Sequence, residues 1–201
     1  SKIYTVFTIH NIMYQGRYGI SVFDDILGLP NFSMQDLVLD SDINFMKGAI
    51  QTADRITTVS ETYREELLKG ENSYRMENAL NIRASDFIGI VNGIDCNSYK
   101  LRTNKKSCKK DLQKKMCLKE SDDTPVIAMV SRLCEQKGMS IIKPCLEEIL
   151  KEDIQLVVLG KGEYMDEEFF KYLERIHPDK VRAHICFDRE MSKTIYSGAD
   201  I

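Results

Sequence analysis

A regular alternation of apolar segments after Pro125 constrains the fold of this chain more than any other feature. Short runs rich in β-branched residues alternate there with segments whose apolar residues repeat at helical spacing. The predicted strands are Val126–Val130, Ile154–Leu159 and His184–Phe187, and the predicted helices are Met139–Lys151, Asp166–Ile176 and Met191–Ser197. A strand-helix-strand order of this kind predicts an α/β fold, with a parallel sheet and helices on its faces.

The first half of the chain shows a looser version of the same pattern. The expected strands are Ile3–Ile9, which we expect to be buried on both faces, Arg55–Ser60 and Phe87–Val91. Ile43, Met46, Ile50 and Ala53 repeat at helical spacing. Thr62 and Glu65 have the spacing of a capping box, which predicts a second helix that ends near Gly70. The sequence makes no clear prediction for residues 71–86.

A lysine-rich stretch separates the two halves. Tyr99–Lys119 contains eight lysines, one arginine and a single acidic residue, Asp111. Because aromatic residues are not interleaved with these cations, the stretch indicates a solvated linker or surface helix rather than an RNA-binding patch. We therefore place a domain boundary here, between residues 1–98 and residues 99–201.

The charge balance excludes several classes of partner. The chain has 28 Lys and Arg against 31 Asp and Glu, which gives a formal net charge of −3. That balance argues against nucleic acid or an anionic membrane as the main partner, and no apolar run of about 18 residues predicts a transmembrane helix. The start lacks a secretory signal and begins inside a strand-like run without a methionine. We expect a cytoplasmic protein, of which this chain is a piece.

The six cysteines are widely spaced, and no CxxC pair occurs. Structural zinc sites usually draw on such close pairs, so we expect no metal site. Reduced thiols are the expected state in a chain of this length that lacks a secretion signal.

Three polar clusters follow predicted strands, which is where ligands bind in open parallel sheets. His10 and Asn11 follow the first strand, and the turn pair Asn92-Gly93 follows the third. Taken singly, each is weak support for a site, since lone histidines are often structural and Asn-Gly turns are common.

The third cluster follows Val126–Val130 and carries two cations, Arg132 and Lys137. Two fixed cations at a strand end suit a diphosphate, because they neutralise charge on a departing phosphate. Gly160 and Gly162, which follow the next strand, permit close backbone approach to a ligand. The sequence lacks a P-loop, an HExxH motif and a GxSxG motif, so the corresponding enzyme classes lose their usual support.

Taken together, these clusters resemble the bacterial glycogen synthases and the related plant starch synthases. The matching segments, in order along the chain, are TIHNIMYQG (Thr8–Gly16), INFMKGAIQTADRITTVSETY (Ile43–Tyr63), GIVNGID (Gly89–Asp95), VSRLCEQKG (Val130–Gly138) and YSGAD (Tyr196–Asp200). Each is weak alone, but five in register are specific, and the resemblance covers nearly the whole chain.

The resemblance implies a retaining GT-B glycosyltransferase that transfers glucose from ADP-glucose to the non-reducing end of an α-1,4-glucan such as glycogen or starch. Two Rossmann-like domains face each other in this family, and neither a metal nor another cofactor is required. Residues 1–98 would be the C-terminal part of the acceptor-side domain, and residues 99–201 the N-terminal part of the nucleotide-sugar domain. Plant or algal members would lie in the plastid. The oligomeric state is left open.

The resemblance also implies roles for single residues. His10 corresponds to the histidine that contacts the transferred sugar, with Asn11 beside it, and Asn92-Gly93 to the sugar-binding turn. Arg132 and Lys137 would bind the diphosphate and stabilise the leaving ADP. Gly160 and Gly162 would line the nucleotide pocket, and the Phe187 ring would lie against adenine.

Two departures and two alternatives remain. The family's KxGGL, EPCGL and STGGL motifs do not occur in these 201 residues, so the chain alone is expected to be inactive. Tyr74-Arg75-Met76 replaces a glycine-containing stretch, and arginine adopts positive φ less readily than glycine. The alternatives are a GT-B transferase that uses another nucleotide sugar and a non-catalytic, glucan-binding remnant.

Overall fold

A computed structural model describes residues 3–99 and 104–201, which form two compact units. The first unit comprises Ser1–Ile94 and the second Asp95–Ile201. The predicted domain boundary lies slightly later, after residue 98. Part of the lysine-rich stretch, residues 100–103, lies outside the described residues.

The second unit is built on a parallel three-stranded sheet. Its strands are β7 (Val126–Val130), β8 (Gln155–Leu159) and β9 (Val181–His184), in the spatial order β7-β8-β9. All five residues of β8 are buried, as expected of a central strand with both faces covered. The predicted parallel α/β architecture is therefore confirmed for this unit.

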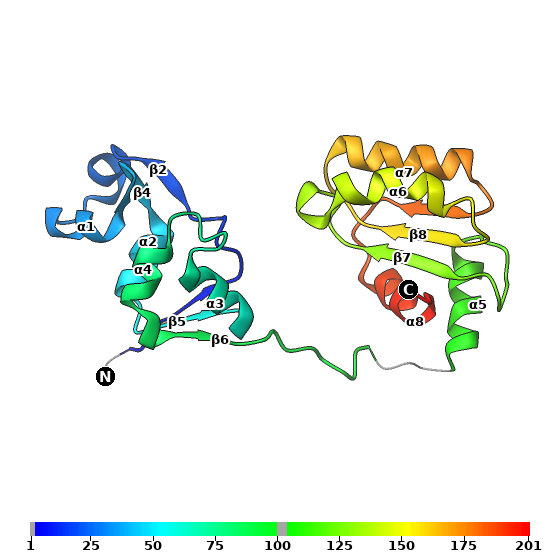
Figure 1. Cartoon of the computed structure of the whole chain (residues 1–201), viewed down its shortest axis with the longest axis horizontal. Helices are drawn as coiled ribbons and strands as arrows, with labels where there is room; N and C mark the ends of the chain where they lie inside the picture. Colours follow the sequence, from blue (N-terminus) through cyan, green and yellow to red (C-terminus); the bar gives the residue numbers. More distant parts are fainter. Residues whose placement is uncertain (1–2, 100–103) are drawn as a thin grey trace. The chain divides into compact units, whose positions relative to one another are not determined.

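Helices cover both faces of this sheet (Figure 1). Helices α6 (Met139–Ile149) and α7 (Tyr164–Ile176) pack on one face, around a core that includes Leu146 and Phe170. Helices α5 (Lys105–Lys115) and α8 (Arg189–Gly198) pack on the other face, around Leu112 and Ile195. The end of the chain runs beside β7, because Ala128 N donates to Ile201 O over 2.9 Å and Asp200 N donates to Val126 O over 2.8 Å.

One prediction for this unit needs correction. Strand β9 covers Val181–His184 and not His184–Phe187, because the Cys186 N–H turns back to the His184 carbonyl at 2.9 Å and leaves the ladder. For the lysine-rich stretch, the structure favours the surface helix over the linker, since residues 105–115 form α5. That helix buries Lys109, Leu112 and Gln113 against the sheet and α8, so only its outer face is solvated.

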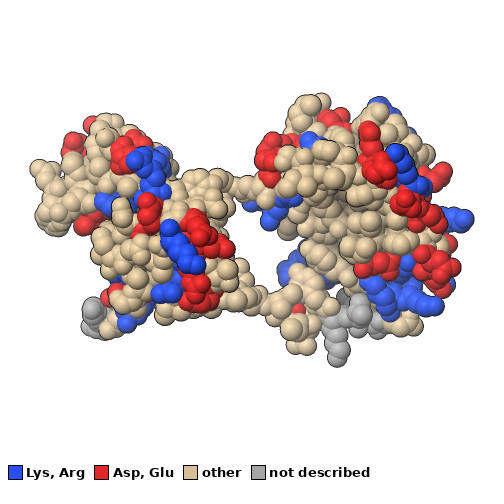
Figure 2. All heavy atoms as spheres, viewed as in Figure 1, with Lys and Arg blue, Asp and Glu red and all other residues tan. Residues whose placement is uncertain are grey.

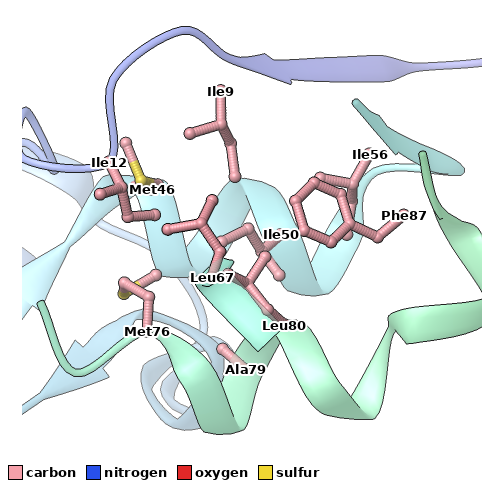
Figure 3. Packing of buried hydrophobic residues seen from close by; sticks show 10 residues of the cluster. All are labelled: Ile9, Ile12, Met46, Ile50, Ile56, Leu67, Met76, Ala79, Leu80 and Phe87. Atoms are coloured by element: carbon pink, nitrogen blue, oxygen red, sulfur yellow. The ribbon is translucent and has the colours of Figure 1, made fainter. Parts of the chain in front are cut away.

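The first unit contains a second parallel sheet, in the order β1-β5-β6. Its strands are β1 (Val6–Ile9), β5 (Arg55–Thr58) and β6 (Phe87–Gly89). Helices α2 (Phe45–Thr52), α3 (Glu61–Lys69) and α4 (Glu77–Ile82) pack on one face. Figure 3 shows the resulting core, in which side chains from β1, β5 and β6 meet Ile50, Leu67 and Leu80 of the three helices.

The prediction that the first strand is buried on both faces is wrong for the described residues. Ile9 points into the core, whereas Val6 is 63% exposed. Successive side chains alternate between the faces of a strand, and the helices cover only one face of this sheet.

Two local predictions in this unit are also wrong. Ile43 lies in a strand, β4 (Asp42–Asn44), and the helix starts at Phe45 with Asn44 as its cap. The cap of α3 is Ser60 rather than Thr62, since the extended Ser60 side chain accepts from Tyr63 N. Serine caps as well as threonine, and here it comes first along the chain.

A small antiparallel sheet and several short helical turns fill residues 17–44. The sheet has the order β2-β4-β3, with β2 at Arg17–Gly19 and β3 at Val38–Leu39. A π-helical turn η1 (Phe23–Leu27), a 3₁₀ turn η2 (Asn31–Ser33) and α1 (Met34–Leu37) connect its strands. A further 3₁₀ turn, η3 (Ala84–Asp86), precedes β6.

Lysines, arginines and acidic residues are interspersed on the visible face of each unit in Figure 2, as the near-balanced composition predicts. Within the described ranges, no helix has both the length and the apolar character that crossing a membrane requires.

A buried ion pair holds α5 to the end of the chain. The Lys109 ammonium lies 2.8 Å from Asp200 Oδ2, with a lysine side chain that is only 7% exposed. Burial raises the pKa of Asp200, but hydrogen bonds from Lys109 and from Val126 N outweigh it, so the pKa lies below its ordinary value. Folding thus favours the carboxylate at neutral pH.

We expect Lys109→Met to lower the free energy of unfolding by about 1–3 kcal/mol, because it leaves a partly buried carboxylate without its partner. Lys110→Met, at an exposed lysine on the same helix, should cost less than about 0.5 kcal/mol. Urea denaturation at pH 7 measures both. A lowered pKa stabilises the fold above the unfolded-state pKa of about 3.9, and this stabilisation is lost as pH falls through the folded-state value. The loss of unfolding free energy caused by Lys109→Met should therefore become smaller in acid. Equal losses for Lys109→Met and Lys110→Met at pH 7 would contradict the role given to the Lys109–Asp200 ion pair.

Candidate functional site

The second unit has a cavity of about 520 Å³ at the carboxyl edge of its sheet. In parallel sheets this edge is where ligands bind. The segments that follow all three strands contribute to its wall, together with α8 and Tyr99. The lining residues are Tyr99, Val130, Ser131, Arg132, Leu159, Gly160, Lys161, Cys186, Phe187, Asp188, Arg189, Ser192 and Tyr196.

The segment that carries Arg132 is held by the segment after β8. Ser131 N donates to Leu159 O at 3.2 Å, and Leu133 N donates to Lys161 O at 3.1 Å. These bonds continue the β7–β8 ladder past the ends of both strands. Arg132 therefore stands between two anchored residues at the cavity wall.

Gly160 and Gly162 make this close approach possible. A Cβ atom on Gly160 would lie 1.9 Å from Ser131 O, and one on Gly162 would lie 1.8 Å from Leu133 O. The sequence analysis expects these glycines to admit a ligand. Gly160 does line the cavity, but the backbone that each glycine admits is that of residues 131–133.

The charged side chains of the cavity wall are mostly cationic. Arg132, Lys161 and Arg189 contribute positive charges, and Asp188 contributes one carboxylate. Asp188 Oδ1 is used by the fold, since it caps α8 by accepting from Met191 N at 2.8 Å. Phe187 adds an aromatic ring that is 92% exposed, so its face is available for stacking. Cations beside an exposed ring suit an anionic aromatic ligand such as a nucleotide.

The two cations predicted together from the sequence occupy different places. Arg132 lines the cavity, whereas Lys137 ends a 3₁₀ turn, η4 (Glu135–Lys137), and is not among the lining residues. Gly138 follows with φ of +78° and is the residue that precedes α6 as its N-cap. Gly162, the residue after Lys161 in the sequence, is likewise not among the residues that line the cavity.

In the first unit, His10 and Asn11 follow β1 directly. His10 is exposed. Asn11 shapes the loop, because its Oδ1 accepts from Met13 N at 2.9 Å in an Asx turn. Tyr63 of α3 supports the same loop through its hydroxyl, which accepts from Ile12 N at 3.2 Å. Asn11 thus has a structural partner within the loop that carries His10.

Asn92 and Gly93 follow β6 and are both exposed. Because β1, β5 and β6 are parallel, the residues after β1 and β6 lie at the same sheet edge. The two strands flank β5, so they are about 10 Å apart. The structure thus places His10 and Asn92 at one edge, two strands apart.

A buried polar network anchors the loop after His10 at its other end. Asn44, which is fully buried, donates through Nδ2 to Gln15 Oε1 at 2.7 Å while its Oδ1 caps α2. Gln15 Nε2 in turn donates to Tyr74 O at 3.0 Å. Buried amides are costly when unpaired, so the network fixes the 10–16 loop against both segments.

The stretch in which Tyr74-Arg75 replaces glycine does adopt the backbone that glycine favours. Tyr74 has φ of +50° and Arg75 has φ of +71°. Arg75 is paired with Asp40 at 3.0 Å, and Tyr74 supplies the carbonyl that Gln15 binds. The unfavourable φ values are thus kept where the backbone carbonyl serves the buried network.

Sequence reasoning missed several lining residues. Lys161, Cys186, Asp188 and Arg189 all line the cavity but were not predicted as site residues. Each follows a strand or begins a helix at the carboxyl edge. That position is the signal that could have found them, although the predicted strand His184–Phe187 placed Cys186 inside a strand rather than after one.

Comparison with known proteins supports the motif assignment. Residues 1–82 match the family model described as the starch synthase catalytic domain. The glycogen synthase of Desulforamulus reducens is 40% identical over 99% of this chain and 45% of its own length. That of Bacillus subtilis is 39% identical over 100% of this chain and 45% of its own length. The chain therefore spans less than half the length of these relatives.

Solved structures give the fold. The catalytic domain of starch synthase IV from Arabidopsis thaliana, solved with ADP and acarbose, matches with a TM-score of 0.86 and 30% identity, over 98% of this chain and 44% of that one. Anabaena HepE, solved with UDP and glucose, matches with a TM-score of 0.55 at 16% identity over 94% of this chain and 43% of that one, and so shows a likeness of fold alone.

The architecture is accordingly that of a GT-B glycosyltransferase, as predicted. More particularly, the chain is similar to the glycogen and starch synthases over nearly all of its own length and somewhat less than half of theirs.

The close contact at Gly160 generates a stability prediction. Gly160→Ala should lower the free energy of unfolding by about 2 kcal/mol or more, because the new methyl group collides with the Ser131 carbonyl. Gly19→Ala is a matched control, since nothing lies within 4 Å of its Cβ position. Denaturant titration compares the two variants with the unchanged chain. Equal stabilities for both would show that residues 131–133 do not approach this closely.

Proposed function

We propose that the protein to which this chain corresponds transfers glucose from ADP-glucose to the non-reducing 4-hydroxyl of an α-1,4-glucan, with retention of configuration. The observation that carries the proposal is the cationic cavity at the carboxyl edge of β7-β8-β9, with Phe187 exposed beside it. The starch synthase IV structure holds ADP and acarbose, an association that fits both substrates of the proposed reaction. The proposed setting is the cytoplasm, or the plastid in a plant or alga.

In the proposed binding mode the second unit holds the nucleotide. The exposed Phe187 ring stacks on adenine, and Arg132 binds the diphosphate with charge-assisted hydrogen bonds. Lys161 and Arg189 add positive charge to the same wall. Gly160 admits the Ser131 carbonyl and thereby helps to place the Arg132 backbone in the cavity wall.

The proposed chemistry needs neither a metal nor another cofactor. The bond from the glucosyl carbon to the diphosphate oxygen breaks, and the bond from that carbon to the acceptor oxygen forms on the same face. The acceptor proton passes to the departing phosphate. Arg132 and Lys137 stabilise the charge that develops on the diphosphate while the glucosyl carbon is oxocarbenium-like. His10 and Asn92 contact the transferred sugar.

The nucleotide site can be tested on the chain itself. Isothermal titration should detect ADP binding, and Arg132→Ala should weaken it at least about tenfold, because a charge-assisted hydrogen bond contributes roughly 1.5–3 kcal/mol. Arg175→Ala is the matched control, since Arg175 lies over the Tyr172 ring outside the cavity. ADP affinity that does not respond to Arg132→Ala would overturn the assignment. Tighter binding of UDP than of ADP would instead favour a transferase for another nucleotide sugar.

The catalytic roles need the full-length enzyme. Lys137→Ala should lower kcat roughly 10²-fold, as expected when one stabiliser of transition-state charge is removed. His10→Ala should also lower kcat. Lys151→Ala, at an exposed lysine paired with Glu148, provides the control. Steady-state kinetics with ADP-glucose and glycogen measure both effects. An unchanged kcat for Lys137→Ala would exclude Lys137 from this role. For His10→Ala, a change in the glucan KM alone would place His10 at the acceptor site. A protein that binds glucan but neither binds ADP nor transfers glucose would be a remnant.

A further inference from the structure

Three potential metal ligands gather at the end of β9. The ligand atoms of His184, Cys186 and Asp188 all lie within 4.8 Å of one another, and this is the one group of its kind among residues 3–99 and 104–201. We propose that these side chains bind a zinc-like divalent cation, with a water molecule in the fourth coordination position. The proposed glucosyl transfer invokes no metal, and Cys186 and Asp188 also line the cavity proposed for the nucleotide.

The backbone presents the three ligands on one side. They are alternate residues of a segment that leaves β9 after His184 and bends at Cys186, and their ligand atoms come together there. The His184 carbonyl accepts from both Gly160 N at 3.2 Å and Cys186 N at 2.9 Å, which ties this segment to β8. The ligand positions are therefore supported by main-chain bonds rather than by a loose loop.

The end of the segment is fixed by α8. Asp188 Oδ1 accepts from Met191 N, so the carboxylate is held as the helix cap. Its second oxygen, Oδ2, lies 4.0 Å from His184 Nε2. The cap thus orients one carboxylate oxygen toward the imidazole.

The spacing is close to that of a bound site but slightly open. Zinc bonds of about 2.0–2.1 Å to nitrogen and 2.3 Å to sulfur place tetrahedral ligands roughly 3.4–3.6 Å apart. The His184 and Asp188 side chains are 44% and 39% exposed, so small rotations can close the remaining gap. Three protein ligands with an open fourth position are typical of accessible rather than structural zinc sites.

The ligand types and charges select the ion. Imidazole, thiolate and carboxylate together suit Zn²⁺ or Co²⁺ and not Mg²⁺ or Ca²⁺, which prefer oxygen. A thiolate and a carboxylate together balance the charge of a dication. Lys161 and Arg189 line the same cavity as Cys186 and Asp188.

The usual sequence rule for zinc sites, which looks for CxxC pairs, does not detect this site. The expectation of no metal site rests on the absence of CxxC pairs, whereas here a single cysteine alternates with a histidine and an aspartate along one segment. The competing interpretation is that Cys186 merely fills the core beside Val130 and Met191, while His184 and Asp188 form a solvated pair.

Cobalt titration of the full chain under anaerobic conditions distinguishes the two. We expect one equivalent of Co²⁺ to give tetrahedral visible absorption and a thiolate-to-cobalt charge-transfer band in the near ultraviolet. Zn²⁺ should displace the cobalt, since it binds such sites more tightly. Cys186→Ser should abolish the charge-transfer band. Asp188→Asn, which retains the helix cap, should weaken binding at least about tenfold.

Matched variants complete the test. Cys134→Ser and His177→Gln change the same residue types elsewhere in the second unit and should leave the spectrum and the affinity unchanged. The proposal is overturned if no stoichiometric cobalt band appears, or if the band survives Cys186→Ser and disappears with Cys134→Ser. Because no nucleotide is present in this titration, its result is separate from that of the ADP measurement.

Discussion

The approach of two backbone segments at the end of the second sheet underlies the account of this molecule. Ser131 and Leu133 continue the β7–β8 ladder beyond the strands, and the absence of a side chain at Gly160 and Gly162 is what lets them. This contact turns Arg132 from a residue in a surface loop into a fixed part of the cavity wall. A cation whose backbone is held in advance binds an anionic ligand without the loop first losing entropy.

In the first unit, buried side-chain hydrogen bonds hold the loop at the sheet edge in place. A buried chain of amides, from Asn44 through Gln15 to the carbonyl of Tyr74, secures the loop that follows β1. Tyr74 and Arg75 keep positive φ values to present that carbonyl. In both units the parallel sheet supplies an edge, and a few main-chain and buried polar contacts then determine which side chains the edge presents.

Much of the second unit could be predicted from the sequence because its helices and strands have strong periodicity. The observed bounds of β7, Val126–Val130, are the predicted ones, and Arg132 and Gly160 line the cavity as their positions after strands indicate. Phe187 also lines the cavity, but only the family resemblance had indicated it. The predicted position of β9 was wrong because apolar residues continue beyond its end, at Ile185 and Phe187. The turn at Cys186 depends on a backbone hydrogen bond, which the residue types do not predict.

In the first unit, periodicity alone was less informative. Ile43 fits the helical spacing but pairs in a strand, because Asn44 caps the helix after it. The exposure of Val6 depends on which helices pack on the sheet and not on the strand itself. The roles of His10, Asn92 and Lys137 rest on the family resemblance, since the geometry within each unit gives only their places at loop and strand ends.

The central claim is that the edge of the second sheet is the nucleotide site, and amide chemical-shift mapping tests it most directly. In a titration of the isotopically labelled chain with ADP, the account predicts that the shifted amides cluster at Ser131–Arg132, Gly160–Lys161 and Phe187–Arg189. Shifts confined to other segments, or an ADP titration that perturbs none of these three, would contradict it.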